Sequence, residues 1–266
     1  MIVNADARFI PLADESVNCV ITSPPYYGLR NYGVDGQLGL EQTPDEYIAN
    51  LVAVFRECRR VLRDDGTLWL NLGDSYACNP SGSASNTYLS KRAELIGAGS
   101  TRINKIFDGC KPKDLIGIPW MVAFALRADG WYLRQDIIWH KPNPMPESVK
   151  DRCTKAHEYI FLLAKSQKYY YDAEAVSEPV AREWDESNGG NLSPNGIHKA
   201  NGVMRERGGE YPKCKGTRNR RSVWTVTTKP FKGSHFATFP PDLIEPCVLA
   251  GSAAGDTVLD PFNGAG

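Results

Sequence analysis

The chain has 266 residues, 42% of them hydrophobic and 23% charged, a globular composition with room for one large domain and its core. Its 31 basic and 31 acidic residues balance, so the net charge gives no sign of a polyanionic partner. No apolar run is long enough to span a membrane, and residues 1–6 lack the basic and apolar regions of a signal peptide. These features argue against a membrane or secreted protein and predict a soluble, cytoplasmic one.

The seven cysteines are scattered along the chain, and none forms a C-x-x-C pair. An odd and widely spaced set argues against a disulfide framework and against a structural zinc site. We therefore expect free thiols, a reducing compartment and no bound metal.

The first clear element is a short buried strand, predicted by the apolar, β-branched run over residues 17–21. It ends at residues 22–26, Thr-Ser-Pro-Pro-Tyr, where two prolines fix the backbone and carry no N–H donor. The Ser23 hydroxyl and the proline carbonyls can accept hydrogen bonds, and Tyr26 adds a flat ring. This set suits a planar ligand with an amino group, and the alternative is a strand that simply ends in a proline turn.

A helix is predicted to begin at Thr43-Pro44-Asp45-Glu46, which combines a hydroxyl cap, a first-turn proline and acids that favour the helix dipole. Apolar residues then recur at helical spacing as far as Leu62. We expect Arg63-Asp64-Asp65-Gly66 to end this helix, with Gly66 in a left-handed conformation, and a strand to follow over residues 67–72.

A further helix is predicted over residues 113–130, and further strands over residues 131–142 and 157–165. Alternation of helix and strand is typical of a parallel α/β sheet. His140 and His157, at the ends of these strands, could act as acid–base residues, but we interpret them as structural or hydrogen-bonding histidines.

Three irregular segments interrupt this pattern. Arg30 lies in a glycine-containing loop, where a phosphate contact and a solvated arginine are both open. Residues 77–111 form a long polar segment, either a flap over a ligand or a disordered insertion. Residues 199–232 carry ten basic and two acidic residues, a local net charge of +8 that suits phosphate binding, although a solvated basic loop is the alternative.

The chain ends with residues 255–266, Gly-Asp-Thr-Val-Leu-Asp-Pro-Phe-Asn-Gly-Ala-Gly, which predict a strand followed by an acidic residue and a glycine-spaced loop. In doubly wound α/β sheets, ligands bind outside the carboxyl ends of the strands, where glycines allow close backbone approach. A single Gly-x-Gly is a weak signal by itself.

Together, the segments at 22–26 and 260–266 resemble two motifs of the DNA methyltransferases that methylate base amino groups. Residues 239–246, Phe-Pro-Pro-Asp-Leu-Ile-Glu-Pro, look like the segment that precedes the cofactor loop in that family, and residues 137–142 and 157–162 are similar to two further blocks. The order, with the target-amine loop first and the cofactor loop last, resembles the family's β-type permutation. The resemblance spans nearly the whole chain.

This resemblance implies a doubly wound, mostly parallel α/β sheet of the Rossmann-like methyltransferase type. Residues 1–171 and 233–266 would form the catalytic domain, and residues 172–232 a loop-rich target-recognition insertion. The implied reaction transfers a methyl group from S-adenosylmethionine to an exocyclic amine in double-stranded DNA, after base flipping, by direct attack and without a covalent enzyme intermediate.

The resemblance also implies a role for individual residues. The catalytic loop would consist of Ser23, Pro24, Pro25 and Tyr26. The cofactor would be bound by Asp6, Phe239, Asp260, Pro261, Phe262, Gly264 and Gly266, although Asp6 is equally well explained as a turn aspartate. DNA would be contacted by Arg30, Lys213, Lys215, Arg218, Arg220 and Arg221.

Serine rather than aspartate at position 23 resembles the branch of the family that methylates cytosine N4, and adenine N6 is the alternative. The family pattern continues past the cofactor loop with a helix and an acid that binds the ribose, whereas this chain stops at Gly266. We therefore expect a truncated polypeptide, and an inactive DNA-binding remnant is a second alternative. A bacterial or phage source and a cognate restriction endonuclease as partner are also implied.

Overall fold

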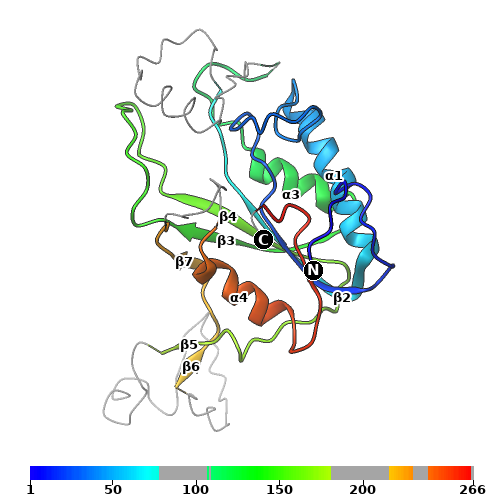
Figure 1. Cartoon of the computed structure of the whole chain (residues 1–266). Coiled ribbons are helices and arrows are strands. Elements are labelled where there is room, and N and C mark those ends of the chain that lie inside the picture. The colour runs from blue at the N-terminus through cyan, green and yellow to red at the C-terminus, as the bar shows by residue number, and fades with distance from the viewer. Residues whose placement is uncertain (78–106, 108, 181–215, 230–238, 265–266) are drawn as a thin grey trace, which may run out of the picture. The chain divides into compact units, whose positions relative to one another are not determined.

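The computed structural model describes residues 1–77, 107, 109–180, 216–229 and 239–264 (Figure 1). Most of the polar segment 77–111 lies outside these ranges, as do Lys213, Lys215 and Gly266. The chain divides into two units, one formed by Met1–Asp172 with Ser222–Gly266 and the other by Ala173–Arg221. The recognition role predicted for residues 172–232 stays a prediction.

The first unit is built on a six-stranded sheet with the order β7-β3-β4-β2-β1-β8. Its strands are β1 (Val17–Thr22), β2 (Leu62–Leu72), β3 (Tyr132–His140), β4 (His157–Ala164), β7 (Val223–Thr225) and β8 (Val258–Leu259). Parallel pairing joins β1 to β2, β1 to β8 and β3 to β7, whereas β4 runs antiparallel to both of its neighbours. The mostly parallel α/β sheet predicted from the sequence is therefore confirmed.

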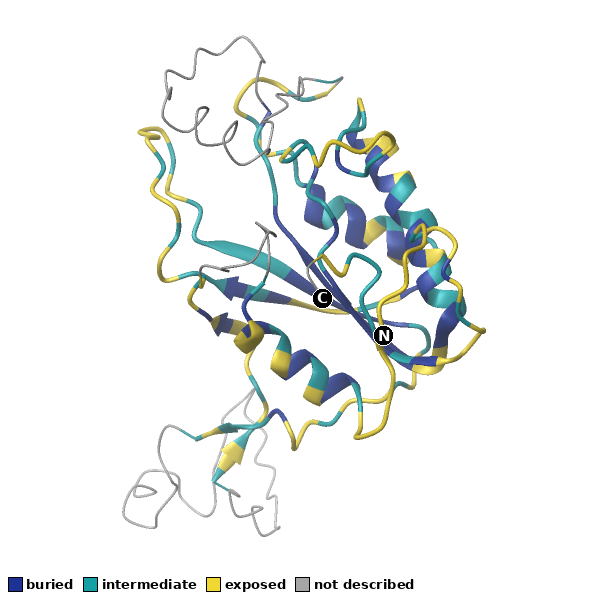
Figure 2. Cartoon of the chain, viewed as in Figure 1, coloured by how far each residue is buried: buried dark blue, intermediate teal, exposed yellow. Residues whose placement is uncertain are grey.

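Helices cover both faces of this sheet (Figure 1). Along β2, Leu68, Leu70 and Leu72 pack in one core with α1 (Pro44–Val61) and α3 (Ile118–Ala128). Trp69, which alternates with these leucines, faces α4 (Pro241–Gly251). The two are so close that a Cβ on Gly251 would come within 2.8 Å of Trp69 Nε1. Strands β1, β2 and β4 are accordingly mostly buried (Figure 2), as is usual in sheets covered on both faces.

Helix α1 begins as predicted, with a capping box in which the Glu46 N–H donates to Thr43 Oγ1 at 3.2 Å and the Thr43 N–H donates to Glu46 Oε2 at 3.3 Å. Its predicted end is wrong. The helix stops at Val61, and Gly66 lies within β2 rather than in a left-handed cap. A Cβ on Gly66 would come within 2.5 Å of Leu62 Cγ, so the glycine serves close packing inside the strand.

The second unit contains a two-stranded antiparallel sheet of β5 (Glu178–Pro179) and β6 (Thr217–Arg218). Within the described ranges, no helix is long and apolar enough to cross a membrane, and no group of three or more His, Cys, Asp or Glu residues could hold a metal ion. The described cysteines are free thiols.

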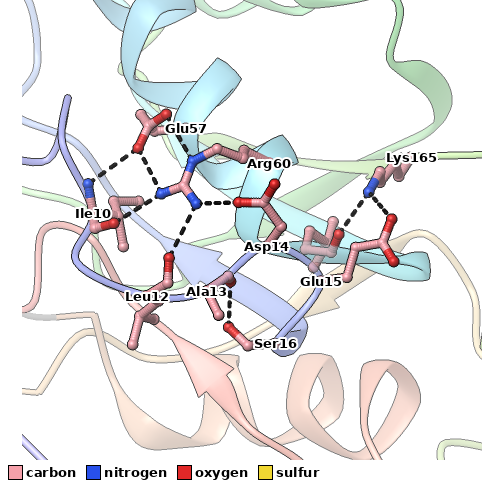
Figure 3. A network of polar contacts seen from close by, with 10 residues as sticks. Ile10, Leu12, Ala13, Asp14, Glu15, Ser16, Glu57, Arg60 and Lys165 are labelled. Atoms are coloured by element: carbon pink, nitrogen blue, oxygen red, sulfur yellow. Dashed lines mark hydrogen bonds and ion pairs between the residues drawn. The ribbon is translucent and has the colours of Figure 1, made fainter.

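The segment before β1 is held against the end of α1 by one guanidinium (Figure 3). Arg60 donates to the carbonyls of Ile10 and Leu12 at 2.8 and 3.0 Å, and it forms ion pairs with Asp14 at 2.5 Å and Glu57 at 2.9 Å. One planar group therefore satisfies two backbone acceptors and two carboxylates, which a lysine could not do.

Replacing Arg60 by alanine should lower the free energy of unfolding by about 1–3 kcal/mol, because two partly buried carbonyls lose their donor. The matched control is Arg63→Ala, which removes a half-exposed guanidinium paired only with Asp65 in the described part of the chain and should cost less than about 0.5 kcal/mol. Urea unfolding followed by circular dichroism measures both variants. Equal losses would contradict the role given to Arg60.

Candidate functional site

Two loops from opposite ends of the chain meet at one edge of the sheet. Strands β1 and β8 are parallel neighbours, so residues 22–26 and residues 260–264 both leave from carboxyl ends of strands. The Thr22 hydroxyl donates to Asp260 Oδ1 at 2.5 Å, across a separation of 238 residues. The two sequence motifs therefore lie at the place where ligands bind in sheets of this kind.

Asp260 is partly buried and organises the second loop. Its Oδ1 also accepts a hydrogen bond from the Phe262 N–H at 2.9 Å, which turns the backbone after β8. Burial raises the pKa of the Asp260 carboxyl, while the hydrogen bonds from Thr22 and Phe262 act in the opposite direction. Its Oδ2 has no hydrogen-bond partner among the described residues, so it retains an acceptor for a ligand.

The rest of this loop is shaped for close approach. Phe262 packs against the hydrophobic core, and Pro261 beside it is partly buried. Gly264 has a φ of +58°, in the left-handed region that favours glycine. Asn263 and Gly264 are exposed, so a ligand at this edge would meet them.

The first loop offers acceptors and few donors. The Pro25 carbonyl accepts a hydrogen bond from the Tyr47 hydroxyl at 2.8 Å, and the Tyr26 carbonyl accepts one from the Leu29 N–H at 3.3 Å. In the part of the chain that the structure describes, the Pro24 carbonyl has no such partner. The Pro24 carbonyl and the Ser23 hydroxyl are therefore acceptors that remain for a ligand.

Tyr26 is anchored by its hydroxyl. That group lies 2.8 Å from Glu158 Oε2 and 3.0 Å from Asn71 Oδ1, and the Ser23 hydroxyl lies 3.4 Å from it. The ring packs so closely over Gly73 that a Cβ there would come within 2.5 Å of Tyr26 Cε2. Burial, and then the charge of Glu158, raise the pKa of the Tyr26 hydroxyl well above its usual value.

Glu158 in turn pairs with Lys141, whose ammonium donates to Oε1. These two side chains are only 17% and 18% exposed. Since β4 is antiparallel to β2 and β3, the first residues of β4 lie at the same edge as the last residues of its neighbours. Glu158, Asn71 and Lys141 meet there for that reason.

Sequence reasoning missed these three residues as part of the site. The available signal was strand parity, because Asn71 alternates with the core residues Leu70 and Leu72 and so points to the opposite face. Strand parity does not reveal that β4, which carries Glu158, is antiparallel to its neighbours. That direction brings the first residues of β4, rather than its last, to the site.

Asp6 and Phe239 are the remaining predicted cofactor residues that the structure describes. Asp6 makes a turn, in which its carboxylate accepts hydrogen bonds from the backbone and guanidinium of Arg8, at 2.9 Å for the backbone N–H. This contact corresponds to the turn aspartate that the sequence left open. Phe239 is partly buried just before α4. Their part in cofactor binding stays a prediction.

Among the predicted DNA-binding residues, Arg30 is partly buried in its loop, with its carbonyl bound to Gln37 Nε2 at 2.9 Å. In the second unit, Arg218 and Arg221 share one carboxylate, with Nε atoms 3.1 and 2.5 Å from Glu178 Oε1. Hydrogen bonding to Arg221 is the main cause of the lowered pKa of Glu178. Arg220, which lies between these two residues in the sequence, is partly buried.

The two histidines make contacts of a structural kind. His140 Nδ1 lies 3.2 Å from Thr225 Oγ1 on the neighbouring strand β7, and the His157 ring meets the Tyr159 ring edge-on at 5.3 Å. Neither contact involves Ser23 or Asp260.

Comparison with known proteins gives a consistent result. The profile of a DNA methylase family, N6_N4_Mtase, matches residues 17–266. The chain is 50% identical over 256 residues to the type II methyltransferase M.Cfr9I of Citrobacter freundii, an alignment that covers 96% of this chain and 73% of that protein.

Two solved structures support the fold. The chain is similar to the PvuII DNA methyltransferase, described as cytosine-N4-specific, with a TM-score of 0.57 and 16% identity over 94% of this chain and 68% of that one. It is also similar to a putative DNA modification methylase of Thermus thermophilus complexed with S-adenosyl-L-methionine, with a TM-score of 0.52 and 21% identity over 97% and 76% of the two chains. With the family profile spanning nearly all of its residues, the chain belongs to the N6/N4 DNA methylase family.

Proposed function

We propose that this protein is a type II DNA methyltransferase that transfers a methyl group from S-adenosylmethionine to cytosine N4 in double-stranded DNA. The hydrogen bond between Thr22 and Asp260 carries this proposal, because it joins the loop suited to an amine to the loop suited to a cofactor. A donor and an acceptor of a methyl group must lie side by side, and most of the rate enhancement in such a reaction comes from that proximity and orientation.

The residues present fit the cofactor. Asp260 Oδ2 is an acceptor without a partner in the described ranges, Phe262 offers an apolar ring, and the left-handed Gly264 lets the backbone approach a ligand closely. These residues would hold S-adenosylmethionine, which supplies an electrophilic methyl group when bound. Asp6, Pro261, Phe239 and Gly266 are proposed as further contacts.

The target loop would bind the amine through its acceptors. An exocyclic amine on an aromatic ring is a poor nucleophile, because its lone pair is delocalised into the ring. Ser23 Oγ and the Pro24 carbonyl would accept its two N–H hydrogens and hold the nitrogen in a pyramidal geometry, which directs the lone pair toward the methyl group. Pro25 would help to fix the loop conformation, because its carbonyl accepts a hydrogen bond from the Tyr47 hydroxyl.

The base must leave the duplex to reach this loop, as it does for other enzymes that act on a base atom. The Tyr26 ring, fixed at its hydroxyl by Glu158, is proposed as the platform on which the flipped base stacks. A ring that is already held in place loses little conformational entropy when the base arrives.

The modified base should be N4-methylcytosine, because Ser23 rather than an aspartate begins the Pro-Pro-Tyr motif. DNA methylated by the purified protein, digested to nucleosides and analysed by mass spectrometry, reports the product directly. DNA incubated without S-adenosylmethionine is the control. N6-methyladenine as the sole product would reject the inference from Ser23 and leave the enzyme class intact.

Replacing Ser23 by alanine should slow methyl transfer by roughly 5- to 150-fold, which corresponds to about 1–3 kcal/mol for a lost hydrogen bond in the transition state. Binding of S-adenosylmethionine, measured by calorimetry, should change little because the cofactor loop is intact. Ser16→Ala is the matched control, since that hydroxyl donates to the Ala13 carbonyl at the other end of β1. An unchanged rate in Ser23→Ala would reduce the loop to a proline turn.

The basic part of the second unit is proposed to bind DNA together with Arg30, Lys213 and Lys215. Glu178 holds Arg218 and Arg221 near one another, and such a pair suits phosphate or a guanine edge. The type II names of the relatives also suggest a cognate restriction endonuclease as functional partner.

Replacing Arg218, Arg220 and Arg221 together by alanine should weaken DNA binding and reduce the slope of log K against log salt by roughly one for each lost phosphate contact. Fluorescence anisotropy over a salt series measures affinity and slope together. Arg127→Ala, which removes an exposed arginine from α3, is the control. If the triple variant keeps both quantities, the segment is a solvated basic loop.

A further inference from the structure

We propose that Glu158 is a positioning residue for the amine-binding loop. Acting through Tyr26, it sets the direction of the Ser23 hydrogen bond, so that Ser23 Oγ presents lone pairs to the substrate amine. The idea of an amine substrate rests on the proposed function, whereas the hydrogen-bond direction follows from the contacts around Tyr26.

The first contact that fixes this direction is Asn71. Its amide nitrogen donates to the Tyr159 carbonyl at 3.0 Å, which orients the side chain and turns Oδ1 toward the Tyr26 hydroxyl. An amide oxygen can only accept a hydrogen bond. Asn71 therefore requires a donor from Tyr26.

The second contact is Glu158, whose Oε2 lies 2.8 Å from the Tyr26 hydroxyl. An ionised carboxylate also can only accept. The Lys141 ammonium, bound to the other carboxylate oxygen, balances its charge where both side chains are largely removed from water. Lys141 Nζ is itself held 4.1 Å from the centroid of the Trp139 ring, so the cation has a fixed place.

Tyr26 has one hydroxyl hydrogen, and Asn71 Oδ1 and Glu158 Oε2 compete for it. Its remaining lone pair faces Ser23, whose Oγ is 3.4 Å away. Ser23 can therefore only be the donor in this contact, and its own lone pairs stay available on the outer side. An exocyclic amine brings two N–H donors, so a serine that pointed its hydrogen outward would repel it.

A neutral group at position 158 weakens this control. Glutamine can turn its NH₂ toward Tyr26, which leaves Asn71 Oδ1 as the acceptor that competes with Ser23 for the Tyr26 hydrogen, so the serine hydroxyl is no longer held in one direction. The raised pKa of Tyr26 agrees with a hydroxyl that keeps its proton throughout.

The bond itself is tested without DNA or cofactor. Tyr26→Phe and Glu158→Gln should each lower the urea midpoint of unfolding, and the double variant should lose clearly less than the sum of the two, because both disrupt the same contact between Tyr26 and Glu158. Additive losses would reject the coupling, whatever reaction the protein catalyses.

The functional consequence is tested by single-turnover methyl transfer to DNA at saturating S-adenosylmethionine. Glu158→Gln should lower the rate about tenfold while leaving DNA affinity unchanged, and Tyr26→Phe should match it. In a Ser23→Ala background, Glu158→Gln should change the rate less than about twofold, since no hydroxyl remains to be oriented.

The matched control is Glu57→Gln, which neutralises another partly buried, ion-paired glutamate on α1 and should leave the rate unchanged. If Glu158→Gln folds and keeps the wild-type rate, or if its effect persists undiminished without the Ser23 hydroxyl, the proposal fails. Absence of methyl transfer in the wild-type protein would instead reject the proposed function. Urea unfolding of the two single variants and the double variant would still decide whether Tyr26 and Glu158 are coupled.

Discussion

The parallel pairing of β1 with β8 is the constraint on which the site depends. Only Cys19 with Val258 and Val20 with Leu259 are in register, so the pairing itself is short. It nevertheless closes a loop of almost the whole chain, and the entropy of closing a loop rises only slowly with its length. Because parallel strands bring their carboxyl ends to one edge, the proposed amine loop and the proposed cofactor loop meet there.

The antiparallel strand β4 places a side chain at the site in a way that a parallel strand could not. A parallel strand reaches the ligand edge with its last residues, after its buried stretch, and a short loop usually follows. Strand β4 reaches the same edge with its first residues, so Glu158 stands at the point where β2 ends in Asn71 and β3 leads into Lys141. The acid and the amide thus lie in strands and the cation directly follows one, so all three are held more rigidly than in a long loop.

Local chemistry made much of the fold predictable. The capping box at Thr43, the apolar periodicity of α1 and the alternation of helices with strands each reflect interactions within a few residues, and the structure agrees with them. Gly66 was misjudged because Asp-Asp-Gly after a helix is a common stop signal. The deciding contacts, with the Leu62 side chain and the Asn18 carbonyl, depend on how β2 packs on β1.

The candidate site was likewise predictable only where its chemistry is local in the sequence. Ser23 and Asp260 carry their chemistry in the sequence, and the structure joins their two loops through Thr22. Tyr26 was interpreted only as a flat ring, since its hydroxyl partners lie 45 and 132 residues away. Glu158 gave no signal, because a glutamate at the start of a strand is usually solvated, and strand direction alone makes it a partner of Tyr26.

The selectivity proposed for the loop at residues 22–26 would come from the acceptors that the protein itself occupies. Two prolines remove N–H donors from the loop, which leaves consecutive carbonyls and one hydroxyl. An amine offered all of these would have several binding geometries, and only some would direct its lone pair correctly. Tyr47 and the Leu29 N–H occupy the carbonyls of Pro25 and Tyr26, and Glu158 draws the Tyr26 hydrogen inward. The core beneath the loop therefore leaves the Pro24 carbonyl and the Ser23 hydroxyl open, and we propose that this pair of acceptors matches the two hydrogens of an amine.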